Sequence, residues 1–159
     1  MSKKLAIIGF GEMGKRHGRD FIELSRGAVK LQAVVEPDDV RYAEGCEWTG
    51  CQPARYDSVK TMLAREKPDG VIVASPNHRH LENLRELEQA AVPLLLEKPL
   101  DSTFEKICDV VRFARRYPVP IMVHHVMRYA PIVRKARELI TSGALGRVCS
   151  AHFMQTIAG

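Results

Sequence analysis

Short apolar runs alternate with segments of helical periodicity along almost the whole chain. Aliphatic runs apolar enough to be buried on both faces, as parallel strands are, predict strands over 4–9, 29–36, 70–75, 93–97 and 119–124. Apolar positions at helical spacing predict helices over 13–25, 56–66, 78–91, 102–116 and 131–142. This repeated order predicts an α/β fold, a doubly wound parallel sheet with right-handed crossovers.

Polar residues mark the expected helix starts. The pair Asp38-Asp39 predicts a short helix, which Gly45, Gly50 and Pro53 are expected to break. Further start signals are Tyr56-Asp-Ser-Val59, Asn77 before its helix, and a capping box from Ser102 to Glu105.

The last segment departs from the pattern. A helix closes at Gly143, and residues 147–154 predict a strand of poor alternation. That strand either pairs at the edge of the same sheet or begins a further unit. We expect one domain over residues 1–142, followed at 143–159 by a junction and the first strand of a C-terminal domain that is absent or truncated.

Composition narrows the class of protein. A chain of 159 residues with 45% hydrophobic and 27% charged residues fits one soluble globular domain. No apolar run approaches the ~20 residues of a membrane span, and the first four residues lead into a strand rather than a secretion signal. The four cysteines have no C-x-x-C spacing. Cys46 and Cys51 could form a disulfide with each other or bind a metal. We expect instead that all four cysteines are free thiols in a reducing cytoplasm.

The net charge of +5 does not by itself indicate nucleic acid, because lysines and arginines are scattered over the predicted helices. No aromatic-rich RNA signature accompanies them. A basic surface that attracts an anionic cofactor is the expected role of this charge.

Three glycines follow the first predicted strand at a spacing that suits a bound dinucleotide. Gly9 lets the chain turn sharply, Gly11 lets bare backbone approach the phosphates, and Gly14 lets the next helix pack closely. That helix directs its N-terminal amides and positive dipole end at the pyrophosphate. The residues between the glycines that join this expected contact are Phe10, Glu12 and Met13.

Glu36 ends the second predicted strand, about 20 residues after the last of these glycines. A carboxylate there accepts hydrogen bonds from an adenosine ribose. The two features together predict a nicotinamide-dinucleotide site.

Polar residues also follow the third predicted strand. Because the carboxyl ends of parallel strands form the ligand crevice, Ser75, Pro76, Asn77 and His80 are expected to face the cofactor. Pro76 fixes the turn, and Asn77 caps the helix or bonds the cofactor. The alternative is a capped helix with two surface histidines.

Glu97 and Lys98 stand at the end of the fourth predicted strand. Charged residues are rarely left there without a partner or a task. A lysine beside a nicotinamide can hydrogen-bond a substrate hydroxyl and stabilise the developing alkoxide. The alternative is an ion pair between the two residues at the sheet rim.

His124, His125 and Arg128 follow the last strand and are expected at the same rim. Adjacent residues on a strand point to opposite faces, and one zinc site would need further ligands that the sequence does not offer. No metal site is therefore predicted.

Taken in order, these segments resemble the N-terminal half of the glucose–fructose oxidoreductase, inositol dehydrogenase and rhizopine-catabolism family. The Glu-Lys-Pro triplet after the Ser-Pro-Asn turn is the most specific part. The matching segments are Gly9-Phe-Gly-Glu-Met-Gly14, Glu36-Pro-Asp38, Ser75-Pro-Asn-His-Arg-His80, Glu97-Lys-Pro99, Arg128-Tyr-Ala-Pro131 and Gly143-Ala-Leu-Gly-Arg-Val148.

The resemblance implies a Rossmann domain coupled to a C-terminal α/β domain, which together oxidise or reduce sugars, cyclitols and related compounds with NAD or NADP. It implies that Lys98 is the catalytic lysine, with Glu97 beside it at the nicotinamide, and that Arg128 lies near the substrate. The other contacts it implies are Gly9, Gly11 and Gly14 with the pyrophosphate, Glu36 with the ribose, and Ser75, Pro76, Asn77 and His80 along the cofactor.

Two features depart from the family pattern. The family usually has Asp where Glu36 stands. The longer acid still reaches a ribose diol and still repels a 2′-phosphate, so it favours NAD over NADP. The neighbouring Arg41 offsets part of this preference. The chain is also about half the family's usual length, and the second domain would supply an Asp and a His to the proton relay. The chain is therefore expected to be the cofactor-binding half.

Three functions use a glycine-rich first turn followed by an acid after the second strand. The first is an oxidoreductase that acts on a small polyol or sugar; the second is a non-catalytic NAD-binding module that serves as a sensor or partner subunit. The third, an adenosylmethionine-dependent methyltransferase, is disfavoured by the Glu97-Lys98-Pro99 rim. The unpaired edge of the terminal strand favours a homodimer.

Overall fold

The computed structural model describes residues 2–154. The chain divides into two compact units between His124 and His125.

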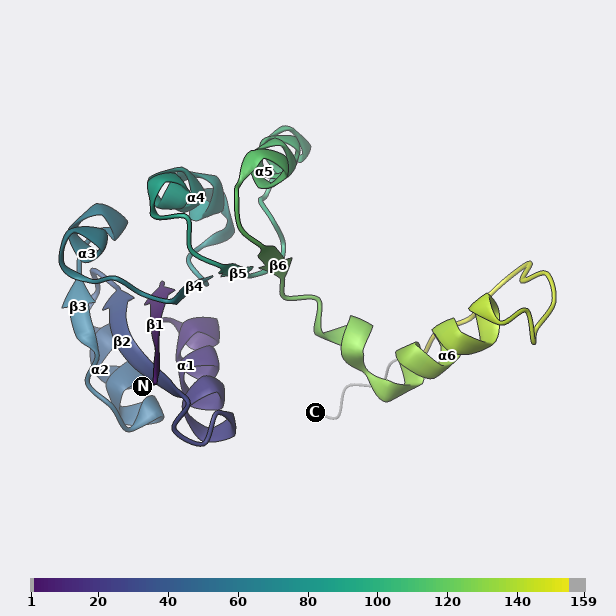
Figure 1. Cartoon of the computed structure of the whole chain (residues 1–159), viewed down its shortest axis with the longest axis horizontal. Coiled ribbons are helices and arrows are strands. Elements are labelled where there is room, and N and C mark those ends of the chain that lie inside the picture. Colours follow the sequence, from purple (N-terminus) through teal and green to yellow (C-terminus); the bar gives the residue numbers. More distant parts are fainter. Residues whose placement is uncertain (1, 155–159) are drawn as a thin grey trace. The chain divides into compact units, whose positions relative to one another are not determined.

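The first unit is built on a six-stranded sheet (Figure 1). Every neighbouring pair of strands is parallel, and the order is β3-β2-β1-β4-β5-β6. The predicted doubly wound sheet is therefore confirmed, with the strand order reversing between β1 and β4. The strands are β1 (Lys3–Ile8), β2 (Val29–Val35), β3 (Ala54–Tyr56), β4 (Gly70–Val73), β5 (Leu94–Leu96) and β6 (Ile121–Val123).

Helices cover both faces of this sheet. In Figure 1, α1 and α2 lie on one face and α3, α4 and α5 on the other. The α-helices are α1 (Glu12–Leu24), α2 (Asp39–Thr49), α3 (Val59–Arg65), α4 (His80–Leu87) and α5 (Phe104–Arg116), with 3₁₀ turns η1 (Asn77–Arg79) and η2 (Glu88–Ala90).

The core consists of two apolar layers, one on each side of the sheet. Along β1, Leu5 and Ile7 belong to the layer under α1 and α2, whereas Ala6 and Ile8 belong to the layer under α3, α4 and α5. Successive side chains of a strand point to opposite faces. This burial on both faces explains why the strands are continuous apolar runs rather than alternating ones.

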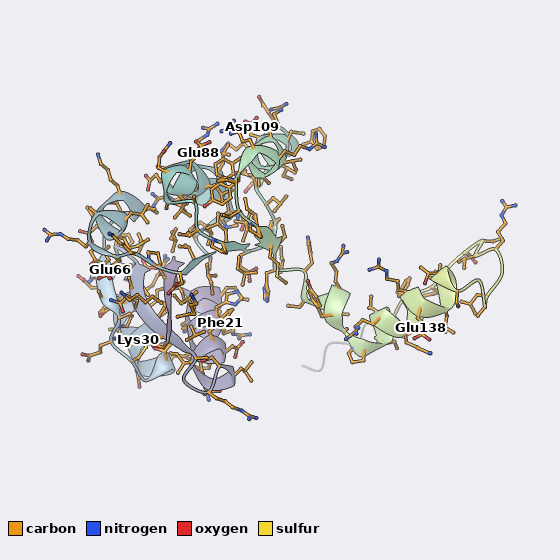
Figure 2. The ribbon with its side chains drawn as sticks, in the orientation of Figure 1. Phe21, Lys30, Glu66, Glu88, Asp109 and Glu138 are labelled. Carbon is orange, nitrogen blue, oxygen red and sulfur yellow. The ribbon has the colours of Figure 1, made fainter. Side chains whose placement is uncertain are left out.

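Polar side chains tie the outer elements together. Glu66, labelled in Figure 2, accepts hydrogen bonds from Tyr56 Oη and Gln32 Nε2, both at 2.9 Å. Asp38 caps α2 by accepting from Arg41 N, and Ser58 caps α3 by accepting from Thr61 N. The caps predicted for these two helices are confirmed.

The predicted break at Gly45 is wrong, because α2 runs through it without interruption. A Cβ at this position would lie 2.3 Å from the Phe10 ring. Gly45 is therefore a packing residue that lets the helix approach the ring, and this long-range contact is not visible in local sequence.

Three of the predicted helix starts and caps also differ from the structure. Tyr56 belongs to β3, which pairs with Ala33–Val35 of β2, and not to the following helix. Thr103, not Ser102, caps α5. Asn77 lies inside η1 and caps no helix.

The second unit contains η3 (Val126–Tyr129) and α6 (Pro131–Thr141). No strand forms within 147–154, so the predicted strand is wrong over these residues. A strand exists only with a hydrogen-bonded neighbour, and the described residues offer none to this segment. The predicted boundary between 142 and 143 stays a prediction; residues 155–159 lie outside the described part of the chain.

Candidate functional site: a phosphate-binding turn and a carboxylate flanked by two histidines

The turn after β1 has a geometry that only glycine allows at its first position. Gly9 has a φ of +85°, and its amide donates to Val35 O across 2.8 Å. A Cβ on Gly9 would lie 2.7 Å from Ser75 Cα and N. The turn therefore packs directly against the end of β4, at the point where strand order reverses.

The other two glycines have different surroundings. A Cβ on Gly14 would lie 2.0 Å from Gly9 O, so glycine here lets α1 pack onto the turn. A Cβ on Gly11 would meet nothing within 4 Å, and Gly11 caps α1 without a side-chain hydrogen bond. The backbone at Gly11 thus faces open space beside the N-terminus of a 13-residue helix, an arrangement that suits a bound anion.

Glu36 joins β2 to this turn. Its side chain is buried; Oε2 accepts from Phe10 N at 2.9 Å and Oε1 accepts from Asp38 N at 3.1 Å. Each carboxylate oxygen can accept a second hydrogen bond. Arg55 Nε also donates to Glu36 O at 2.7 Å, so the backbone here is held as well as the side chain.

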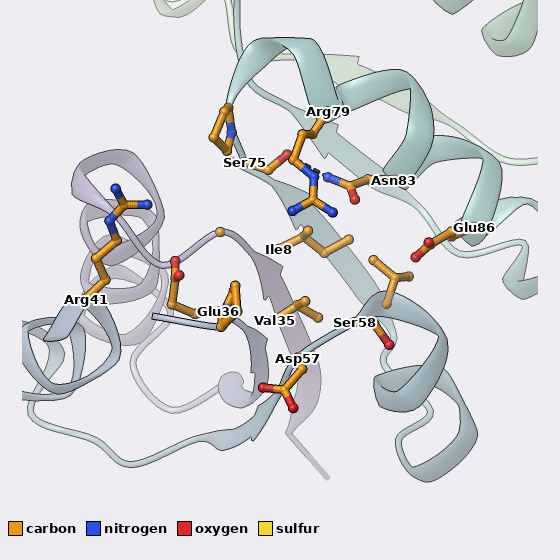
Figure 3. Close-up of a pocket in the computed structure, with 14 residues that line it drawn as sticks. Ile8, Val35, Glu36, Arg41, Asp57, Ser58, Ser75, Arg79, Asn83 and Glu86 are labelled. Carbon is orange, nitrogen blue, oxygen red and sulfur yellow. Dashed lines mark hydrogen bonds between the residues drawn. The ribbon is translucent and has the colours of Figure 1, made fainter. Parts of the chain in front are cut away.

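A pocket opens beside Glu36 at the carboxyl ends of β1, β2 and β4 (Figure 3). Arg41 stands on the Glu36 side, and Arg79 lies on the Ser75 side. The polar residues that line it include Glu36, Arg41, Ser58, Ser75, Arg79 and Asn83.

Ser75 is held by α4. Its Oγ accepts from Asn83 Nδ2 across 2.6 Å, the dashed line in Figure 3. His80 Nε2 lies 2.9 Å from Ser75 O, and His80 Nδ1 lies 3.2 Å from Leu100 O. His80 is completely buried and connects the Ser75 loop to the loop after β5; its contact with a cofactor stays a prediction.

For Phe10, too, a contact with the cofactor stays a prediction. Its ring is completely buried, and its amide is already bonded to Glu36, so neither group faces the pocket. The residues after Gly11 are placed differently. Glu12 is exposed, and hydrogen bonds from Lys15 and then Arg16 lower the pKa of its carboxyl. Met13 is half-buried in α1.

Pro76 lines the pocket with Ser75, and the expectation that both face the cofactor stays a prediction. Asn77 is half-buried in η1 and is not among the lining residues in the described part of the chain. Arg128 is an exposed residue of η3 in the second unit. The structure therefore gathers the glycine turn, Glu36 and the Ser75 loop.

A second cluster lies at the ends of β5 and β6. Glu97 Oε1 lies 2.7 Å from His17 Nε2 and 2.6 Å from His124 Nδ1, and the two imidazole rings meet edge to face at 4.5 Å. Burial raises the pKa of the Glu97 carboxyl, but hydrogen bonds from His17, Lys98 N and His124 outweigh it and hold the pKa below its usual range. Glu97 is therefore a buried carboxylate.

Lys98 follows this carboxylate directly. Its amide donates to Glu97 Oε2 at 3.0 Å, and the residue is exposed. The alternative of a side-chain ion pair with Glu97 finds no support, because the described partners of this carboxylate are the two histidines and an amide.

Two polar residues of these clusters, Asn83 and His17, were not predicted from the sequence. Asn83 follows His80 by three residues on one helix face, a spacing that could have indicated it. His17 lies 80 residues from Glu97 in the chain, and no local pattern signals that contact.

Comparison with known proteins agrees with this architecture. Residues 3–125 match the model of the family described as "Oxidoreductase family, NAD-binding Rossmann fold". The chain belongs to this family.

Individual relatives cover nearly all of the chain. Rhizopine catabolism protein MocA of Rhizobium meliloti is 28% identical over 91% of this chain and 44% of its own length. Inositol 2-dehydrogenase of Corynebacterium glutamicum is 30% identical over 93% of this chain and 44% of its own length. The structure of myo-inositol 2-dehydrogenase from Lactobacillus plantarum superposes with a TM-score of 0.80 at 25% identity, covering 93% of this chain and 43% of that one. The chain thus spans less than half the length of these relatives.

In the described residues no helix is long and apolar enough to span a membrane.

Proposed function

We propose that this chain is the cofactor-binding part of an NAD-dependent oxidoreductase. In the proposed reaction a hydride passes between the nicotinamide and a carbinol carbon of a sugar, cyclitol or related hydroxy compound. The observation that carries this proposal is the bond from Phe10 N to Glu36 Oε2, which joins the phosphate-binding turn to the ribose-binding acid in one fixed unit.

The pocket supports NAD rather than NADP. Glu36 Oε1 and Oε2 have acceptor capacity left for the two ribose hydroxyls, whereas a 2′-phosphate would bring a second negative charge beside a buried carboxylate. Arg41 lines the same pocket and offsets part of that repulsion.

Lys98 is the residue that we assign to the reacting end. Its ammonium group would hydrogen-bond the substrate oxygen and stabilise the alkoxide that develops as the hydride leaves. The bond from Lys98 N to Glu97 Oε2 supports this role, because it fixes the backbone from which the side chain extends. Arg128 is proposed to lie on the substrate side.

The proposed substrate class is inferred from the names of the relatives. Several of them are named as inositol 2-dehydrogenases, which suggests a cyclitol or sugar. One relative at 30% identity is instead a 2,7-anhydro-N-acetylneuraminate hydratase, so a test must measure hydride transfer itself.

We also propose a cytoplasmic homodimer. The four cysteines are free thiols, which is typical of a reducing compartment. Exposed apolar side chains of the second unit, including Ile132 and Ile140, support self-association.

Two measurements test the proposal. NADH should raise the melting temperature and show energy transfer from Trp48, the single tryptophan, whereas adenosylmethionine should do neither. No shift with NAD, NADH or NADP would contradict the proposal. If the chain serves an enzyme, NAD and a panel of polyols should give reduced nicotinamide and Lys98→Ala should abolish it, whereas a non-catalytic module should give no turnover with either protein. Because the proposed proton relay needs groups of a second domain, the isolated 159-residue chain is expected to bind the cofactor but to turn over poorly or not at all.

A further inference from the structure

The cluster of His17, Glu97 and His124 has a defined proton arrangement. A carboxylate oxygen only accepts hydrogen bonds, so both nitrogens that face Glu97 Oε1 must carry protons. His17 is therefore protonated on Nε2 and His124 on Nδ1. The charge of the cluster then depends on the second nitrogen of each ring.

Topology assigns this cluster to one half of the site. The pocket beside Glu36 lies at β1, β2 and β4, whereas Glu97 and His124 follow β5 and β6. A dinucleotide binds across the point where strand order reverses, with one half on each side. The cluster thus lies on the half opposite the adenosine pocket, where the nicotinamide belongs.

We propose that the His17–Glu97–His124 cluster is the charged wall of the nicotinamide half-site, and that its proton occupancy is linked to the charge of the bound nicotinamide ring. This inference rests on the proposed function. With both imidazoles neutral the cluster carries one negative charge, which favours the positively charged oxidised ring over the neutral reduced ring. Uptake of a proton at His124 Nε2 removes that preference.

His124 is the member best placed to exchange a proton. Its side chain is 24% exposed, against 6% for His17 and 5% for Glu97. An imidazole ring can take up a second proton, and the exposure of His124 lets solvent deliver it. Among the described residues, His17, Glu97 and His124 are the ionisable groups in contact within the cluster, and Lys98 and His125 are their chain neighbours.

A metal-binding role fits these distances less well. Two ligands of a tetrahedral zinc ion with bonds of about 2.0–2.1 Å lie roughly 3.3 Å apart. The O···N separations here are 2.7 and 2.6 Å, which are hydrogen-bond lengths. The three polar atoms are therefore paired with one another.

The test compares dissociation constants for NAD, NADH and ADP-ribose between about pH 5.5 and 8.5, using the full chain. In the wild-type protein the ratio Kd(NAD)/Kd(NADH) should fall by about tenfold as the pH rises, the effect of about one pKa unit of coupling. ADP-ribose, which lacks the ring, should show no such dependence.

His124→Asn is the decisive variant, because the Asn amide can still donate to Glu97 while it cannot take up a proton. Its ratio should be independent of pH, and the exposed control His78→Asn should behave as wild type. A thermal melt confirms that His124→Asn is folded. The same ratio of dissociation constants measured in His17→Gln tests the contribution of the second histidine.

The outcomes separate the two proposals. If none of the three nucleotides binds, the proposed function fails and this inference with it. If all three bind but the wild-type ratio does not change with pH, or changes equally in His124→Asn, only the inference is overturned. Zinc bound by the wild type and lost in His124→Asn, with no pH dependence of the ratio, would also overturn it.

Discussion

Phe10 N and Glu36 Oε2 are hydrogen-bonded at 2.9 Å although 26 residues separate them in the chain. The bond places the acid that ends β2 against the turn that ends β1. The glycine turn and the buried carboxylate, the two groups that the proposed dinucleotide site requires, are therefore held together by the fold itself.

Glu36→Gln should weaken NADH binding and reduce the preference for NADH over NADPH by about tenfold. The amide keeps one acceptor oxygen but removes the charge that repels a 2′-phosphate, and one pKa unit of interaction corresponds to a factor of ten. Calorimetric titration with both cofactors measures the effect. Glu47→Gln, an exposed glutamate of α2, is the matched control and should change neither constant.

The glycines of the turn should respond differently to alanine. Gly14→Ala places a Cβ 2.0 Å from Gly9 O and should destabilise the fold by about 3 kcal/mol or more, measured by urea unfolding. Gly11→Ala meets open space, so it should cost less than ~1 kcal/mol while weakening NADH binding. Equal stability of the two variants would contradict this account of the turn.

Gly45→Ala should be destabilising because its Cβ would lie 2.3 Å from the Phe10 ring. Phe10→Leu removes the ring edge, so the double variant should be more stable than the sum of the single effects predicts. Urea unfolding of the four proteins measures this coupling, expected at ~1–3 kcal/mol. Strict additivity would mean that the helix approaches the turn for another reason.

Stability should fall at acid pH in part through Glu97. Its pKa is lowered in the folded protein, so its stabilising contribution is present above the unfolded value of about 4.3 and is lost as the pH falls through the folded value. Melting temperatures measured from about pH 6 to 3 should therefore drop more steeply in the wild type than in Glu97→Gln. Parallel curves would show that this carboxylate does not have a lowered pKa.

Much of the first unit could be predicted from sequence because its signals are local. Continuous apolar strands, the glycine spacing and the caps at Asp38 and Ser58 each follow from residues close together in the chain. β3 was missed because three residues carry too little pattern, and its existence depends on pairing with β2.

The site was harder to predict where it depends on tertiary contacts. Phe10 and His80, which were expected to contact the cofactor, are completely buried: the Phe10 ring packs in the core, and His80 connects two loops. The meeting of His17 with Glu97 depends on how α1 lies against the end of β5, which no short spacing encodes. Residue types indicated the chemistry, and packing decided which atoms were available for it.

A crystal structure of the chain with bound NADH tests the central claim most directly. The account predicts the pyrophosphate at the backbone of Gly11 and the N-terminus of α1, the adenosine ribose on Glu36, and the nicotinamide on the side of Glu97 and Lys98. A pyrophosphate bound away from this turn, or a ribose that does not contact Glu36, would contradict it.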